Sequence, residues 1–529
     1  MSTAARAVTR LAIRQVRRGG LIVAGLSAGM TALVTATYGQ VMADPAAADG
    51  LRALSANPAI RTLFGAPIGL DTAGGFTVWR VGTVITVLLG VWSILAVTRI
   101  TRGEEDAGRW DVLLSGRPTV TATLIVHVAA VMAVAAATAI AVTAVLLAAG
   151  TAPAGALLHG AGTGLLGMFF AAVAALSAQI FAGRPPATGA AVAVLGAGLL
   201  ARMIGDGVTG LAWLHGLTPF GLLALSGPYV HDRVLPLVLL AAATVLIGAL
   251  ALVAARHRDV RGGLVPAAAG RRPRTLLLAS VETFAVRRAL RPLAGWMIGV
   301  GAYYLLIGLT AVSVTGFLRD NPALAGEAAE AGFASLGSVA GFAATLFAIL
   351  ALPVGAFTAV RMGAFVAAEA DRRLTLLASR PVSRSRLIGA EIVATGAAAT
   401  VLVVGAGLAT WIGVAVMGGD LTAGAAVRGA GNVLPIVLLS LGAAVFAAGR
   451  LPRWTGLAGC LPSIGGFLLL VVAESVAAPS WVRDISPFAH LAPVPLTGPD
   501  MAASAVMLAA AAALVVAGIG GYRRRDLGS

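Results

Sequence analysis

Long apolar runs recur along the whole chain, separated by short segments that carry most of its charged residues. Twelve of these runs approach the roughly 20 residues that a helix needs to cross a hydrocarbon layer. We therefore predict an all-α, polytopic integral membrane protein with about twelve transmembrane helices. The predicted spans are residues 20–43, 78–98, 121–149, 158–182, 188–212, 233–255, 291–315, 334–360, 387–417, 425–448, 455–478 and 501–521.

Composition points to the same class of protein. Of 529 residues, 58% are hydrophobic and 11% are charged, and the mean hydropathy is +0.92. A water-soluble domain carries about 25% charged residues. A folded globule in water could not bury this much apolar surface, so membrane lipid is the expected surrounding of the chain.

The basic residues fit membrane topology better than nucleic-acid binding. The formal net charge is +16, and the sequence contains no lysine, so all 38 basic residues are arginine. If both termini are cytoplasmic, most of these arginines fall in cytoplasmic segments, as expected where positive charge is retained inside. We predict a multi-pass protein of the plasma membrane with cytoplasmic termini and no nucleic-acid partner.

A segment in the first half of the chain recurs in the second. AGRWDVLLSGRP at 107–118 and ADRRLTLLASRP at 370–381 share six of twelve positions. WLHGLTPF at 213–220 similarly matches WVRDISPF at 481–488. Such self-similarity indicates an internal repeat, and six spans in each copy make the repeat parallel.

The repeat sets the predicted domain boundaries. Residues 1–255 form a first six-helix transmembrane half and residues 275–529 a second. Residues 256–274 have the composition of a linker, which we place in the cytoplasm.

A short basic segment precedes the first span of each half. Arg6, Arg10, Arg14 and Arg17 fall on one face of a helix, with apolar residues on another. This pattern predicts an interfacial elbow helix, with a counterpart at 275–292. The alternative is a plain positive flank that orients the span.

The loops between the second and third spans of the two halves, 98–120 and 360–386, share an order of residue types. Each contains acids, then arginine, then Leu-Leu, and then a proline that disfavours helix in the residue before it. We predict a short amphipathic helix on the cytoplasmic face, whose leucines fill a groove on a partner while its charges set the register. A purely topological role for the arginines is the alternative.

These loops resemble the coupling helices of ABC transporter permeases, and the full chain is similar to actinobacterial exporters of polyketide antibiotics of the tetronasin type, which fuse two six-helix halves. The resemblance implies two copies of a separate ABC ATPase subunit as partners, with ATP and Mg²⁺ bound there and no cofactor in this chain. The residues that it assigns to ATPase coupling are Glu104, Glu105, Gly108, Arg109, Leu113, Leu114 and Ser115, and more loosely Glu369, Asp371, Arg372, Leu376 and Leu377. The second copy has Ala367 and Ala368 where the first has the glutamate pair.

The sequence contains no motif with which the chain could hydrolyse ATP. A P-loop needs a lysine that contacts the phosphates, and there is none. The expected function is therefore that of a non-enzymatic permease subunit that exports hydrophobic or amphiphilic compounds such as antibiotics and drugs. The alternative is a proton-driven secondary exporter of the major facilitator type, which also has twelve spans in two parallel halves.

A few charged residues fall at the ends of predicted spans. Asp206 and Glu474 occupy corresponding places at the outer ends of the fifth and eleventh spans, and Arg202 precedes Asp206 by one helical turn. We expect either an outer gate or a structural pair. Glu391 is expected at the membrane interface. The lone Cys460 and the six scattered histidines favour neither a disulfide nor a metal site.

Overall fold

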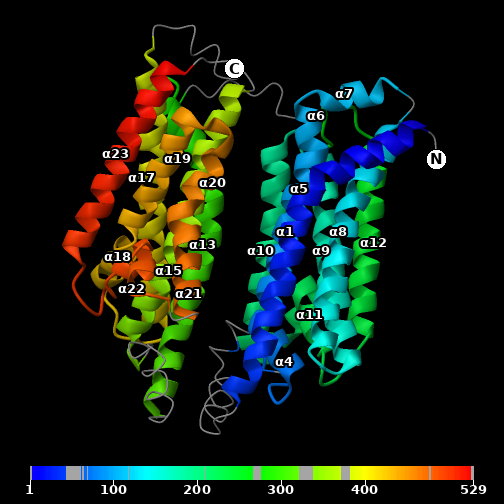
Figure 1. Cartoon of the computed structure of the whole chain (residues 1–529), viewed down its shortest axis with the longest axis horizontal. Coiled ribbons are helices and arrows are strands. Elements are labelled where there is room, and N and C mark those ends of the chain that lie inside the picture. Colours follow the sequence, from blue (N-terminus) through cyan, green and yellow to red (C-terminus); the bar gives the residue numbers. More distant parts are fainter. Residues whose placement is uncertain are drawn as a thin grey trace. The chain divides into compact units, whose positions relative to one another are not determined.

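A computed structural model describes residues 3–42, 61, 65–67, 69–116, 118–207, 209–265, 276–320, 337–370, 382–475 and 478–525 (Figure 1). Within these ranges the chain is helical, contains no β-strand, and has a single isolated bridge between Phe181 and Val265. Twelve described helices are long and apolar enough to cross a membrane. The predicted class, an all-α polytopic membrane protein, is confirmed.

The chain forms two compact units, Met1–Arg271 and Arg272–Ser529, each with six candidate spans among its described residues. The elements of unit 1 are α1 (Thr3–Val41), α4 (Ala73–Thr77), η1 (Val78–Gly82), α5 (Thr83–Thr98), η2 (Arg99–Gly103), α6 (Glu104–Asp106), α7 (Arg109–Leu114), α8 (Val120–Ala148), α9 (Pro153–Ile180), α10 (Arg184–Gly207), η3 (Thr209–Leu217), α11 (Pro219–Ser226) and α12 (Leu235–Arg256). Here η1 and η2 are π-helical turns inside the second span, and η3 is a 3₁₀ helix.

Unit 2 has a corresponding series of elements. They are α13 (Val281–Asp320), α15 (Val339–Ala370), α17 (Arg384–Val416), α18 (Ala423–Gly431), α19 (Leu434–Arg450), η6 (Pro452–Trp454), α20 (Thr455–Cys460), η7 (Leu461–Gly465), α21 (Gly466–Ser475), α22 (Ser480–Arg483), η8 (Pro487–His490) and α23 (Met501–Arg524).

Corresponding helices make corresponding contacts in the two units. In unit 1, α1 packs on α8, α5 packs on α9 and α10, and α9 packs on α12. In unit 2, α13 packs on α17, α15 packs on α19 and α20, and α19 packs on α23. Each unit thus repeats the same helix pairs, as an internal duplication requires.

The basic segment predicted as an elbow helix is continuous with the first spanning helix in each unit. α1 runs unbroken over 39 residues and α13 over 40. At about 1.5 Å per residue, both are far longer than the roughly 30 Å hydrocarbon layer. The basic segments are therefore the first turns of the spanning helices. Figure 1 shows the first turns of α1 inclined to the rest of the helix.

The tenth and eleventh spans are also less regular than predicted. The tenth is divided into α18 and α19 at Asn432 and Val433, and the Asn432 side chain donates to the Ala492 carbonyl at 2.8 Å. The eleventh contains the π-helical turn η7, with Pro462 at its second position. Both interruptions lie where proline or a polar side chain replaces regular helix hydrogen bonding.

Candidate functional site

The loop after the second span of unit 1 folds into a short helix, α7. The second span continues through η2 and α6 to Asp106, and Gly108 then turns the chain with φ of +72°. Only glycine adopts this left-handed conformation readily. α7 follows, and Thr119 caps the next helix by accepting from the Ala122 amide at 3.2 Å. Figure 1 shows α7 crossing the end of unit 1 transverse to α5 and α8.

Apolar side chains hold α7 against its own unit. Trp110 is buried beside Leu124 and Ala255, and its ring lies 5.9 Å from that of His127. Leu113 and Leu114 pack on this cluster and are half-buried. Part of the surface of both leucines is therefore used inside unit 1, and the rest remains exposed. The most exposed apolar side chain of α7 is Val112, at 77%.

The charges of α7 are arranged around this exposed surface. Arg109 is exposed and binds Glu104 through two atoms, Nε to Oε2 at 2.5 Å and Nη2 to Oε1 at 2.8 Å. Asp111 is paired with Arg261. Ser115 is exposed at the end of the helix. The predicted coupling residues Arg109 and Ser115 therefore lie at the surface with Val112.

Glu105, predicted to face a partner, is instead 1% exposed inside unit 1. Its Oε1 and Oε2 accept from Arg258 Nη1 and Nη2 at 2.6 and 2.8 Å. Arg102 Nη1 and the Arg261 amide donate at 2.9 and 2.6 Å. Arg258 Nε donates in turn to Gln179 Oε1 at 2.7 Å. This carboxylate is fully occupied within the unit and does not contribute to a docking surface.

The second predicted coupling loop lies mostly outside the described residues. Asp371, Arg372, Leu376 and Leu377 belong to that part of the chain. Glu369 lies in the last turn of α15 and is paired with Arg525, which follows α23.

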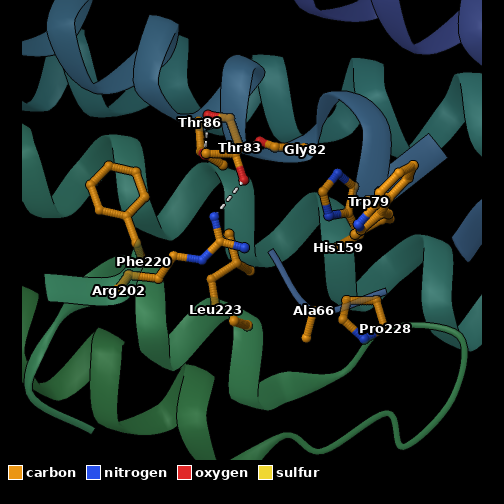
Figure 2. A pocket seen from close by; sticks show the side chains of 12 residues that line it. Ala66, Trp79, Gly82, Thr83, Thr86, His159, Arg202, Phe220, Leu223 and Pro228 are labelled. Carbon is orange, nitrogen blue, oxygen red and sulfur yellow. Dashed lines mark hydrogen bonds between the residues drawn. The ribbon is translucent and has the colours of Figure 1, made fainter. Parts of the chain in front are cut away.

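The predicted ion pair of unit 1 is present at the end of α10. Arg202 is 7% and Asp206 6% exposed, and Arg202 Nε lies 2.6 Å from Asp206 Oδ2. Arg202 Nη1 also donates to Thr83 at 3.0 Å (Figure 2). His215, from η3, contacts the other carboxylate oxygen through Nε2 at 2.9 Å. Burial of both charges matches a structural pair that joins α10, α5 and η3.

Arg202 also lines a cavity of about 80 Å³ within unit 1. Figure 2 shows the Arg202 guanidinium on one side, with Trp79 and the buried His159 on another. Phe220 and Leu223 complete much of the apolar lining. A water needs roughly 10–15 Å³ by this kind of measure, so the cavity has room for several waters and is too small for a drug-sized molecule.

Stability of the η3 contact is expected to depend on pH. The Asp206 hydrogen bond raises the pKa of His215 above its ordinary value of 6.5, although burial and Arg202 oppose this. Because the folded state holds the proton more tightly than the unfolded chain, the stabilisation is complete below pH 6.5 and is lost as pH rises through the raised pKa. Hydrogen exchange of the 209–217 amides, corrected for intrinsic rates, should show more protection at pH 6 than at pH 8. His215→Gln should remove that difference, and an equal difference in the variant would contradict this explanation.

In unit 2, Glu391, predicted at the membrane interface, is 2% exposed inside the helix bundle. It is paired with Arg361, and Arg288 Nη1 lies 3.6 Å from it. Glu474 lies in α21, but its side chain is outside the described part of the structure. Among the described residues, no group of three or more metal-ligating side chains occurs.

Sequence reasoning missed the arginines that bind the acidic residues of these loops. Arg258 and Arg525 each lie just after the sixth helix of their unit. In the sequence they are 153 and 156 residues away from their partners, Glu105 and Glu369. The available signal was an arginine just after the last span of each half, which topology alone also explains.

The fold defines a multi-pass membrane protein, and comparison with known proteins defines its family. A family profile described as "Multidrug efflux system permease Rv1217c, C-terminal domain" matches residues 278–523. The chain is 31% identical over 487 residues to the multidrug efflux system permease protein Rv1217c of Mycobacterium tuberculosis, covering 90% of this chain and 86% of that protein. The chain therefore belongs to the Rv1217c family of multidrug efflux permeases.

Proposed function

We propose that this chain is the membrane-spanning subunit of an ATP-driven exporter whose ATP-hydrolysing subunits are separate polypeptides. One such subunit docks on α7, and a second docks on the corresponding loop of unit 2, around residues 371–381. The end of unit 1 that carries α7 is then cytoplasmic, in agreement with the arginine distribution.

The observation that carries this proposal is the construction of α7. A short helix is set across the end of the bundle, held by Trp110 on one side and presenting Val112 and the Arg109–Glu104 pair on the other. An exposed apolar side chain rimmed by charges is the usual anatomy of a small docking surface. Loops that only connect two spans do not need a buried tryptophan.

Two further observations support a separate motor. The sequence has no lysine, so the P-loop that would bind ATP phosphates is absent from it. The related protein is described as a permease of an efflux system, a description that fits a membrane subunit.

The cargo is expected to be hydrophobic or amphiphilic, such as an antibiotic or drug. The described spans are lined and joined mainly by alanine, leucine, valine and glycine, with scattered threonine and serine. Apolar compounds partition into such surroundings from the membrane without an energetic cost for desolvating polar groups.

The docking surface can be tested with a matched pair of variants. Val112→Asp should reduce the amount of candidate ATPase that co-purifies with the chain by at least 10-fold, because it places a charge at the centre of the apolar contact. Val230→Asp introduces the same charge at an exposed valine between α11 and α12 and should change the yield less than twofold. Full retention of the ATPase by Val112→Asp would remove α7 from the interface.

The energy source requires a separate measurement. In proteoliposomes that contain the chain and the ATPase, efflux of a fluorescent hydrophobic dye should require ATP and stop on addition of vanadate. Dye movement driven by an imposed proton gradient without nucleotide would instead support a secondary exporter.

A further inference from the structure

Both units contain an equivalent ion pair. The alignment of the two sequence halves does not place its acidic residues at matching positions. In unit 1 it joins Glu105, near the end of the second span, to Arg258, two residues beyond α12. In unit 2 it joins Glu369, near the end of α15, to Arg525, directly beyond α23. The repeat offset of 263 pairs Glu105 with Ala368, so the acid has moved by one position.

Each contact also reaches the end of the fourth helix. Arg258 Nε donates to Gln179 Oε1 at 2.7 Å, in the last turn of α9. Arg525 Nη1 donates to the Ala448 carbonyl at 2.7 Å, in the last turn of α19. We call the Glu105–Arg258–Gln179 and Glu369–Arg525–Ala448 sets the clasps of unit 1 and unit 2. Each clasp joins the ends of the second, fourth and sixth helices of its unit.

The clasp of unit 1 is rigid by construction. Arg258 and Glu105 form two parallel hydrogen bonds, a geometry that fixes orientation as well as distance. The segment after α12 is also held by backbone bonds from Leu264 and Val265 to the carbonyls of Gln179 and Ile180, at 3.1 and 2.9 Å. Only three residues separate Glu105 from the first residue of α7.

We propose that the clasps are the elements that make the fourth and sixth helices follow the coupling loop when a motor subunit displaces it. Glu105, Arg258, Glu369 and Arg525 are thus positioning residues for transport. This inference rests on the proposed function. Physically, a charged pair close to the coupling loop transmits a displacement because separating buried charges is costly. The clasp extends this connection to α9, whereas the buried Trp110 of α7 packs on α8 and α12.

The test uses the full chain assembled with its ATPase, and the measured quantity is dye transported per ATP hydrolysed. Glu105→Gln and Arg258→Gln should each lower this ratio at least 10-fold while the ATPase rate stays within twofold, because the motor still turns over without moving the helices. Arg256→Gln, which removes an exposed arginine two residues away, is the matched control and should change the ratio less than twofold. An unchanged ratio in both clasp variants overturns the proposal.

Variants of the unit 2 clasp provide a second test, which is needed if the unit 1 variants do not accumulate in the membrane. They also allow a charge swap that should restore transport. Arg525→Gln should lower the ratio, with Arg524→Gln as its exposed control. The charge swap Glu369→Arg with Arg525→Glu should restore it. A swap in unit 1 is less suitable, because Arg102 also binds Glu105 and would repel an arginine there. If Arg525→Gln and the swap both behave as the wild type, the proposal is wrong.

A measurement without the motor separates this inference from the proposed function. Spin labels at cysteines replacing Val112 and Val260, with Cys460 replaced by serine, report the distance between α7 and the segment after α12 that carries Arg258. The distance distribution should broaden at least twofold in Glu105→Gln and stay narrow in Arg256→Gln. If the wild-type assembly neither hydrolyses ATP nor transports dye, the proposed function fails. The clasp is tested separately, because a distance distribution in Glu105→Gln as narrow as that of the wild type would contradict it whether or not the proposed function holds.

Discussion

Replacing Asp206 alone by leucine should cost about 3–5 kcal/mol of stability, because it leaves the Arg202 guanidinium buried without its counter-ion. Arg202 is 7% exposed and is enclosed by α5, α10 and the chain around Gly65, so it cannot turn to solvent without opening these contacts. Thr83 remains as an acceptor but carries no charge. The apparent melting temperature in detergent should fall by roughly 3 °C or more.

The double variant Arg202→Leu with Asp206→Leu distinguishes a lost ion pair from a lost shape. It removes both charges and should recover most of the loss, since two apolar side chains do not pay for desolvation. Asp420→Leu, at an exposed position of unit 2, should leave the melting temperature nearly unchanged. Equal destabilisation in the single and double variants would show that side-chain packing, and not charge compensation, dominates at this site.

The features that the sequence predicted well are those fixed by local spacing. Arg202 and Asp206 lie one helical turn apart, so their pairing follows from helix geometry once α10 forms. The twelve spans follow from the length of apolar runs. The position of α7 follows from the glycine that permits a left-handed turn and from the proline before α8.

The features that it predicted poorly depend on contacts between distant segments. Glu105 resembles a surface acid until Arg258, 153 residues later, folds back onto it. The burial of Glu391 has no local signal in the sequence, because its partner, Arg361, lies on a neighbouring helix. In both cases the local pattern of charges is the same whether the acid faces water or a buried arginine, so only the tertiary fold separates the two.

In α1, glycines that look like the start of a helix in the sequence are instead positions of close helix packing. Gly19 and Gly20 stand where the apolar run begins, and the predicted first span starts at residue 20. A Cβ at Gly19 would lie 2.8 Å from the Trp92 indole, and one at Gly20 would lie 2.8 Å from Val134. These glycines let α1 approach α5 and α8 closely, and the helix continues through them.

The same use of glycine makes Gly413→Ala a strongly destabilising substitution in unit 2. A Cβ at this position would lie 2.5 Å from the Leu305 carbonyl oxygen and 2.6 Å from the Leu309 amide nitrogen, both backbone atoms of α13. From the other side, a Cβ at Gly308 would meet the Thr410 carbonyl oxygen at 2.2 Å. Backbone atoms cannot move aside as a flexible side chain can, so α13 and α17 must separate, at a cost of about 1–3 kcal/mol.

A glycine on the same helix provides a control of opposite sign. A Cβ at Gly389, also in α17, would meet no atom within 4 Å. Alanine there should raise the melting temperature slightly, since it favours a helix over glycine by up to about 1 kcal/mol. If Gly413→Ala raises the melting temperature in detergent as Gly389→Ala does, helix propensity outweighs the α13–α17 contact. If Gly413→Ala lowers the melting temperature while Gly389→Ala raises it, the close approach of the α13 and α17 backbones requires glycine at position 413.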